Sequence, residues 1–197
     1  LTEDFVGRRK YQITFRINKS GKFLTDKIED ASGLVWANDK KTVFYTKKDP
    51  QTLREYQVYK HVLGTDSKKD ELVFEEEDEK FGVGIGKTNT DKYLFIYCYS
   101  STTTELLWID ADKPEDKPQV FLPRKTGHMY EVSHHDNGFY ILSNADGASN
   151  RKILFSPSFP RNLNKCKELV PHRTDVLLEG LSVFKNFMVI EERAGGL

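Results

Sequence analysis

Apolar and polar residues alternate over many short stretches of this chain, which is the pattern of half-buried β-strands. Tyr11, Ile13 and Phe15 alternate with polar neighbours in the first clear example. Similar runs follow at spacings of roughly 8–12 residues, as is typical of sandwiches, barrels and propellers. No amphipathic helical pattern of convincing length interrupts them. The pattern therefore predicts an all-β protein.

An internal repeat narrows the choice among all-β folds. Pairs of strand-like stretches, each joined by a tight polar turn, begin near residues 33, 81, 130 and 178. The apolar centres of their second stretches are 51, 45 and 48 residues apart, at Phe44, Phe95, Tyr140 and Met188. Two more strand-like stretches follow each of the first three pairs. A period of about 48 residues with four antiparallel strands predicts β-propeller blades, about four of them in this chain.

The repeat is out of phase with both ends of the chain. Residues 1–4 resemble the end of a second strand, and 10–17 and 23–28 supply the third and fourth strands of the same blade. Residues 187–192 are again a second strand. We therefore expect residues 1–197 to be a partial β-propeller domain with open sheet edges, through which the isolated chain self-associates.

The stretch FGVGIGK at 81–87 raises the question of a phosphate-binding loop. Gly82, Gly84 and Gly86 are spaced two apart, whereas the dinucleotide fingerprint and the P-loop need other spacings and a following helix. A β-branched and aromatic run follows instead. We interpret 81–86 as the first strand of a blade, lining the central channel, with glycines where other backbone approaches closely.

Composition excludes several kinds of partner and site. Thirty basic and thirty acidic residues give no net charge, so no nucleic acid or anionic membrane is predicted as a partner. The longest apolar run, 93–99, is far too short to span a bilayer. Two cysteines, Cys98 and Cys166, are too few for a disulfide framework or a zinc cage, which favours a cytoplasmic location. We predict no metal site and no cofactor.

Seven stretches of the chain are long and distinctive: EDFVGRRKY at 3–11, VWAND at 35–39, DPQTLREYQVYKHVLGT at 49–65, DELVFEEEDEKF at 70–81, STTTELLWIDAD at 101–112, VFLPR at 120–124 and LEGLSVF at 178–184. In these stretches the chain resembles the prolyl oligopeptidase family of serine peptidases, and within it the oligopeptidase B (protease II) branch. The resemblance implies a seven-bladed propeller that covers an α/β-hydrolase domain and restricts access to it. It also implies cleavage of short peptides after arginine or lysine by a Ser, Asp, His triad.

None of that catalytic machinery can be placed in this chain. A nucleophile elbow needs Gly-x-Ser-x-Gly, and no serine here has glycines two residues away on both sides. The carboxylates that bind a basic substrate side chain also belong to the hydrolase domain in this family. The expected role is therefore that of a non-catalytic, substrate-gating segment. Its partners would be its own hydrolase domain and short basic peptides. A stand-alone propeller scaffold for protein or peptide binding is the alternative.

Four residues are candidates for interdomain or channel contacts. Arg8 and Arg9 lie in the loop between the second and third strands of the first blade, on a rim where partner domains dock. An arginine fork suits a carboxylate there, although a solvated basic turn is the alternative. His128 and Glu179 lie near the start of inner strands, where they contact substrate or the hydrolase domain, or serve the fold.

Three further features contain charged or reactive side chains. The acidic stretch at 75–80 either steers basic peptides to the channel or is a solvated loop. His134 and His135 precede a hairpin turn without ligands on a second element, so metal binding is not expected there. Cys98 lies in an apolar strand and is expected in the core.

Overall fold

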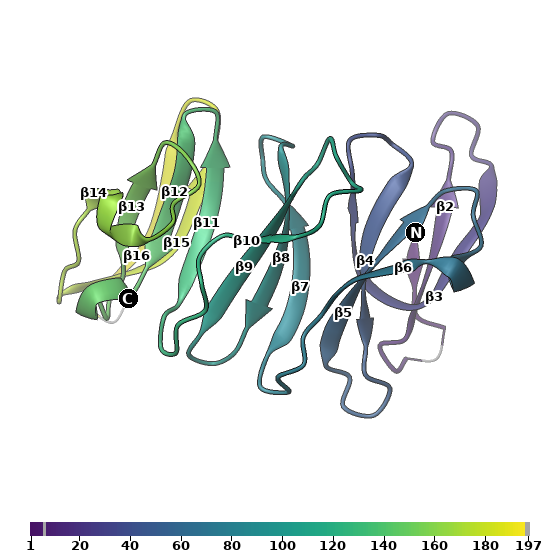
Figure 1. The fold of residues 1–197 in the computed structure, drawn as a ribbon, viewed down its shortest axis with the longest axis horizontal. Helices are drawn as coiled ribbons and strands as arrows, with labels where there is room; N and C mark the ends of the chain where they lie inside the picture. Colours follow the sequence, from purple (N-terminus) through teal and green to yellow (C-terminus); the bar gives the residue numbers. More distant parts are fainter. Residues whose placement is uncertain (6, 196–197) are drawn as a thin grey trace.

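The computed structural model describes residues 1–5 and 7–195, and their backbone is almost entirely β-structure joined by turns. The only helices in this described part are three short 3-10 turns, η1 (Ser67–Lys69), η2 (Ala145–Gly147) and η3 (Leu163–Lys165). The sheets stand side by side in chain order, from the purple N-terminal end to the yellow C-terminal end (Figure 1). The prediction of an all-β protein is confirmed.

The strands form four antiparallel sheets, each with its strands in sequence order. The first sheet contains β1 (Thr2–Glu3), β2 (Tyr11–Arg16), β3 (Phe23–Trp36), β4 (Thr42–Lys48), β5 (Glu55–Val62) and β6 (Glu71–Glu75). The second contains β7 (Gly82–Lys87), β8 (Tyr93–Tyr99), β9 (Thr104–Asp110) and β10 (Gln119–Val120). The third contains β11 (Tyr130–His135), β12 (Gly138–Ser143), β13 (Lys152–Ser156) and β14 (Lys167–Val170), and the fourth contains β15 (Val176–Val183) and β16 (Met188–Ala194).

The second and third sheets are the predicted four-stranded units, but the first sheet differs from the prediction. The expected strands at 23–28 and 33–36 are one continuous strand, β3, of 14 residues. Its first half pairs with β2, as Ile28 does with Ile13, and its second half pairs with β4, as Val35 does with Phe44. Asp30, with a φ of 52°, lies where the register with β2 shifts, and Ala31 after it pairs with Tyr11 of β2 on one side and Lys47 of β4 on the other. The connection between the two units is therefore part of one strand, which joins them into one sheet.

The glycines of β7 are crowded by rings and not by backbone, which corrects the sequence-based interpretation. Gly82 pairs with Tyr99 and Gly84 with Tyr97 across the β7–β8 ladder, so these residues share one face of the sheet. A Cβ atom on Gly82 would lie 3.1 Å from the Cζ atom of Tyr99. One on Gly86 would lie 3.2 Å from the Cε2 atom of Tyr97. The tyrosines of the neighbouring strand therefore occupy the space that the glycines leave.

Apolar side chains fill the spaces between successive sheets. The opposite face of β7 packs against the first sheet in a cluster that includes Phe44, Val58, Phe81, Val83 and Cys98. The second and third sheets are separated by a cluster rich in aromatic rings, among them Phe95, Phe121, Tyr130 and Phe139. Complete burial of such a side chain contributes about 1.5–3 kcal/mol, so these layers hold neighbouring sheets together. Cys98 is in the core, as predicted.

In the loops that follow β1, β4 and β8, a side chain accepts hydrogen bonds from backbone N–H groups and so fixes the shape of the loop. The side chain of Asp4 accepts hydrogen bonds from the backbone N–H groups of Gly7 and Arg9. Asp49 does the same for residues 51 and 52, and Ser100 for residues 102 and 103. Such side-chain caps satisfy amides that no strand partner reaches. These loops and the connections at 76–81 and 121–129 lie along the lower edge of Figure 1, and we call this edge the lower rim.

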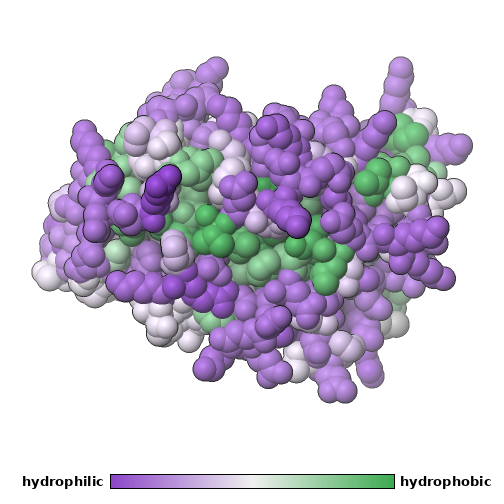
Figure 2. All heavy atoms as spheres, in the orientation of Figure 1, coloured by the Kyte–Doolittle hydropathy of each residue, from purple (hydrophilic) through white to green (hydrophobic). Residues whose placement is uncertain are grey.

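The face seen in Figure 2 is mostly hydrophilic. Its hydrophobic surface gathers in a band across the middle and near the β2–β3 hairpin at the upper right. Exposed apolar residues of the chain include Leu72 on β6, Val120 on β10, and Ile17 and Phe23 at the β2–β3 hairpin. No helix in the described part of the chain has the length and apolar character needed to cross a bilayer.

Candidate functional site

Arg8 and Arg9 lie on the lower rim, exposed, in the loop that Asp4 caps. The cap holds Arg9 in a left-handed conformation, with a φ of 56°. Together with Lys10 the two arginines line a shallow cleft against Pro50 and Leu53 of the next loop. Neither guanidinium makes an ion pair within residues 1–5 and 7–195. The loop therefore presents two uncompensated positive charges, and their contact with another domain stays a prediction.

His128 is buried, in contrast to the arginines. Its Nε2 atom lies 2.9 Å from Ser143 Oγ, and its ring stacks on Tyr130 at 4.9 Å between centroids. Burial, with Lys125 nearby, lowers the pKa of the imidazole. The ring borders a cleft of about 520 Å³ between 122–128 and the loop at 144–147. These contacts give His128 a structural role, and its contact with a substrate stays a prediction.

Glu179 is exposed on the inner strand β15, where an arginine links it to the preceding sheet. Its carboxylate pairs with Arg193 of β16. Its backbone carbonyl accepts a hydrogen bond of 3.2 Å from Arg151 Nη1. The same nitrogen of Arg151 lies 3.1 Å from Glu131 Oε1 on β11. Arg151 therefore ties the first strands of two successive sheets together beside Glu179.

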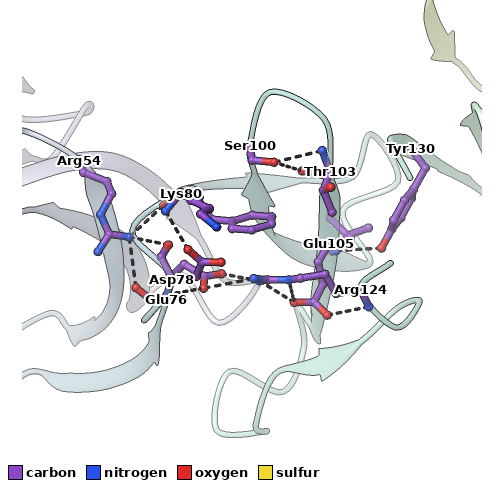
Figure 3. Close-up of polar contacts among 11 residues, drawn as sticks. Arg54, Glu76, Asp78, Lys80, Ser100, Thr103, Glu105, Arg124 and Tyr130 are labelled. Carbon is purple, nitrogen blue, oxygen red and sulfur yellow. Dashed lines mark hydrogen bonds and ion pairs between the residues drawn. The ribbon is translucent and has the colours of Figure 1, made fainter. Parts of the chain in front are cut away.

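The acidic stretch at 75–80 contains a buried carboxylate that sequence reasoning missed. Glu76 is only 6% exposed, and both of its carboxylate oxygens bind the guanidinium of Arg124 (Figure 3). Arg124 also donates from Nε to Glu105 at 3.1 Å and lies 3.9 Å from the centroid of the Phe81 ring. A bidentate pair of this kind fixes geometry as well as charge. Neither sequence-based interpretation of the stretch applies to Glu76.

A second arginine holds the same connection from the other side. Nη1 of Arg54 donates to the backbone carbonyls of Glu76, Asp78 and Phe81, at 3.2, 3.3 and 2.9 Å (Figure 3). Connection 76–81, which leads from the first sheet to the second, is thus held between Arg54 and Arg124. Glu75, Glu77 and Glu79 remain exposed around it. The stretch therefore combines a structural anchor with a solvated acidic surface.

A histidine and two carboxylates form another buried polar cluster that sequence reasoning missed. His61 is fully buried, with Nδ1 2.7 Å from Asp70 and Nε2 3.3 Å from Asp26. The Tyr45 hydroxyl donates to the second oxygen of Asp70 at 2.9 Å. Both ring nitrogens face carboxylates, so neither is placed to take a proton from a hydroxyl nucleophile. The cluster ties β3 to β5 and serves the fold.

Other reactive groups in the described part of the chain are few. Burial, followed by the nearby Glu76, raises the pKa of the Cys98 thiol, so it stays protonated in the core. No group of three or more histidine, cysteine or acidic residues there has metal-binding geometry. His134 Nδ1 lies 2.6 Å from Thr90 Oγ1, and His135 Nε2 lies 3.0 Å from the carbonyl oxygen of Lys185. These histidines connect neighbouring turns.

Comparison with known proteins accounts for this arrangement of sheets. Residues 1–197 match the family described as "Prolyl oligopeptidase, N-terminal beta-propeller domain". The chain belongs to this family. The predicted β-propeller fold is thereby confirmed, and the prolyl oligopeptidase fold explains why a four-stranded unit recurs along the chain.

Relatives in this family align with the whole chain. Dipeptidyl aminopeptidase BI from Pseudoxanthomonas mexicana is 39% identical over 99% of the chain, and Protease 2 from Moraxella lacunata is 31% identical over 99%. Oligopeptidase B from Leishmania major covers the whole chain with a TM-score of 0.93 and 31% identity. Oligopeptidase B from Trypanosoma brucei, solved with covalently bound antipain, does so with a TM-score of 0.88 and 28% identity.

The chain corresponds to only part of these relatives. It spans 27% of the dipeptidyl aminopeptidase, 28% of Protease 2 and 28% of the Leishmania oligopeptidase B chain. In the prolyl oligopeptidase family the propeller is the N-terminal domain of a larger peptidase. The described residues therefore form propeller structure of a peptidase family, and the residues discussed above belong to that propeller.

Proposed function

We propose that this chain is the substrate-gating, non-catalytic propeller segment of a cytoplasmic serine oligopeptidase that cleaves short peptides after arginine or lysine. The same polypeptide would carry an α/β-hydrolase domain with the catalytic triad. The observation that supports this most is the alignment of the whole chain with oligopeptidase B at a TM-score of 0.93. Size selection follows from the proposal, because only peptides that fit the channel or the gap between domains would reach the triad.

The lower rim is the surface that we propose docks on the hydrolase domain. It carries the uncompensated charges of Arg8 and Arg9, which suit acidic groups across an interface. It also carries connection 76–81, which two arginines hold in one conformation. A rim with fixed loops lowers the conformational entropy lost on docking.

The experiment begins with the complete reading frame from which this chain is expressed. A frame that continues past Leu197 into a Gly-x-Ser-x-Gly elbow supports the oligopeptidase. The expressed protein is then assayed with N-terminally blocked peptide amides ending in arginine, lysine or an uncharged residue. We expect cleavage after the basic residues and its loss after treatment with a serine-directed inactivator. Absence of any such cleavage contradicts the proposal.

A second candidate is release of dipeptides from a free N-terminus. It is favoured by the 39% identity to a protein named dipeptidyl aminopeptidase, which exceeds the 31% identity to Protease 2. The same assay separates the two candidates when each substrate is offered with a free and with a blocked N-terminus. Cleavage that requires the free N-terminus supports this second candidate. A frame that ends without a hydrolase domain supports a propeller scaffold instead.

A further inference from the structure

A cleft beside His128, on the lower rim, is not used by the functions above. It measures about 520 Å³ and is bordered by connection 122–128, the loop 144–147 and residues 161–164 around η3. A volume of this size lies in the range of pockets that hold small ligands. One side chain that reached in from another domain would leave most of the cleft empty, so a larger ligand fits it better.

The hydrogen bonds around His128 fix which ring nitrogen carries the proton. Ser143 Oγ lies 2.9 Å from Nε2 of His128, and it already accepts a hydrogen bond of 3.1 Å from the backbone N–H of Ala145. The Ser143 side chain is fully buried, and a buried hydroxyl that donates to nothing is costly. We therefore assign the hydroxyl proton of Ser143 to the bond with Nε2, which makes Nε2 an acceptor.

The other ring nitrogen, Nδ1, is then an N–H donor without a partner. Burial, with Lys125 nearby, lowers the pKa of His128, so the ring is neutral at pH 7 and carries its single proton on Nδ1. The side chain is only 9% exposed, yet Nδ1 is not among the fully enclosed polar atoms that lack a hydrogen bond. Because His128 borders the cleft, this N–H group is available to a ligand there.

Two cationic side chains border the same cleft. Lys125 and Arg161 are exposed, and neither makes an ion pair or a side-chain hydrogen bond within residues 1–5 and 7–195. The acidic residue on the border is Asp146, whose Oδ2 atom lies 3.1 Å from Nζ of Lys152. The cleft therefore combines two uncompensated positive charges with a free N–H donor. Such a set suits a carboxylate, which is negatively charged and only accepts hydrogen bonds.

We propose that this cleft binds the C-terminal residue of a peptide substrate, with its carboxylate accepting a hydrogen bond from His128 Nδ1 and pairing with Lys125 and Arg161. The lower rim is the surface that we propose docks on the hydrolase domain, so a peptide in the gap between the domains would reach the cleft with its end. The assignment rests on the proposed function for its ligand. It lets the propeller select peptides by a free C-terminus as well as by size.

Binding of uncleaved peptides tests the proposal directly. The protein expressed from its complete reading frame is titrated with fluorescent peptides that contain no arginine or lysine. Each peptide is offered with a free C-terminal carboxylate and with a C-terminal amide, which has the same shape and no charge. We expect the carboxylate form to bind about tenfold more tightly, the lower end of the range for a hydrogen bond to a charged group.

Variants assign this preference to the cleft. Lys125→Ala combined with Arg161→Ala should reduce it toward equality, and so should His128→Gln, because glutamine does not replace the donor at Nδ1. Lys165→Ala is the matched control, since Lys165 is an exposed cation of η3 that does not border the cleft. This control should keep the preference.

Three results would overturn the proposal. The first is equal binding of carboxylate and amide peptides. The second is a preference that persists in the double variant and in a His128→Gln protein that melts like the wild type. The third is a comparable loss in Lys165→Ala, because the general positive charge of the surface then accounts for the preference.

Further measurements distinguish other sources of a carboxylate. Amidated peptides that end in glutamate or glutamine compare a side-chain carboxylate with its uncharged counterpart, and a preference for glutamate as large as that for the free terminus contradicts recognition of the C-terminus. Equal binding of all peptides, together with faster proteolysis between the domains in the double variant, would assign the cleft to an acidic group of the hydrolase domain and overturn the proposal.

Cleavage assays separate this proposal from the proposed function. A protein that prefers free C-termini through the cleft but cleaves no peptide supports the cleft assignment and contradicts the peptidase. A protein that cleaves after basic residues and binds carboxylate and amide peptides equally does the reverse.

Discussion

Glu76 illustrates how one buried carboxylate can hold two sheets of this molecule together. It follows β6 in the chain, and its partner Arg124 follows β10, so the pair links the first sheet to the second. Glu76→Gln removes the bidentate carboxylate from the guanidinium of Arg124, which then keeps only Glu105 as a charged partner. We expect this change to lower the free energy of unfolding by about 1–3 kcal/mol, as measured by urea titration.

Glu77→Gln is the matched control for this prediction, because the neighbouring side chain is exposed. It should change the unfolding free energy by no more than about 0.5 kcal/mol, as exposed substitutions usually do. Equal effects of the two substitutions would show that the ion pair with Arg124 contributes no stability.

Arg8 and Arg9 are expected to affect activity and not stability. Alanine at both positions removes two exposed charges without breaking a side-chain hydrogen bond or ion pair within the described residues. In the full-length protein we expect kcat/KM to change by about twofold to fivefold, the scale of exposed ion pairs, with an unchanged melting temperature. Lys19→Ala with Lys22→Ala, at the turn between β2 and β3, removes two exposed charges elsewhere and serves as control. Unchanged kinetics in the arginine variant would remove these residues from the interface.

His128 is expected to make the fold sensitive to mild acid. Because burial lowers its pKa from 6.5, the unfolded chain binds a proton that the folded chain does not. Stability from this group is present above about pH 6.5 and is lost as the pH falls below that value. His134, whose pKa is also lowered by burial, acts in the same direction.

The measurement is the melting temperature between about pH 7.5 and about pH 5.5, a range that spans ordinary histidine titration. His128→Gln should weaken the fall in melting temperature on acidification. His135→Gln should steepen it, because the hydrogen bond to the Lys185 carbonyl raises the pKa of His135. A fall that is the same in wild type and His128→Gln would contradict the assignment.

At the scale of elements, the glycines of β7 show how the tyrosine rings of β8 limit which residues the neighbouring strand can carry. The Cβ atom of Gly86→Ala would lie 3.2 Å from the Tyr97 ring, which is half-buried and has little room to move. We expect a loss of about 1–3 kcal/mol in unfolding free energy from this overpacking. Gly84→Ala meets only an ordinary contact at 3.8 Å. It should be neutral or stabilising by about 0.4–1 kcal/mol, because alanine restricts the unfolded chain.

Chemical denaturation of the two alanine variants tests this prediction. The informative result is which variant has the lower free energy of unfolding. Gly84 and Gly86 lie on the same strand and face, so strand propensity and unfolded-state entropy are matched. If both variants lose the same stability, the tyrosine rings do not set the requirement for glycine.

The elements were largely predictable from the sequence, and the joins between them were not. Alternation and the repeat identified the strands of the second and third sheets, because period two is a local signal. The pairing of the β7 glycines with Tyr97 and Tyr99 was within reach, since a hairpin turn at 88–92 fixes that register. Fusion of two expected strands into β3 was not, because nothing in residues 29–32 distinguishes a bend from a break.

The candidate site was less predictable, for a related reason. Glu76 and Arg124 are separated by 48 residues, and the acidic run gives no sign of which carboxylate turns inward. The same holds for His61, whose partners Asp26 and Asp70 come from other elements. Contacts between blades depend on how the sheets pack, which a residue pattern within one blade does not encode.

At the scale of the whole molecule, the open edges of the sheets matter. β1 and β16 each have one hydrogen-bonding edge without a strand partner in the described chain. Met188 and Val189 on β16 are also exposed. We expect the isolated 197-residue chain to associate through these edges, giving dimers or larger species by light scattering at high concentration. A monodisperse monomer would contradict this prediction. Ile190→Pro, which removes a backbone N–H donor from β16, is expected to reduce association.

The continuity of β3 has a mechanical consequence. Because one strand pairs with both of its neighbours, the units on either side are joined by a hydrogen-bonded ladder, and we expect them to move together. Relative motion of neighbouring sheets is then expected where they contact each other through side chains alone, such as the aromatic layer between the second and third sheets. The two units joined by β3 are therefore expected to move as one, with their motion relative to the third sheet located at the boundary between the second and third sheets.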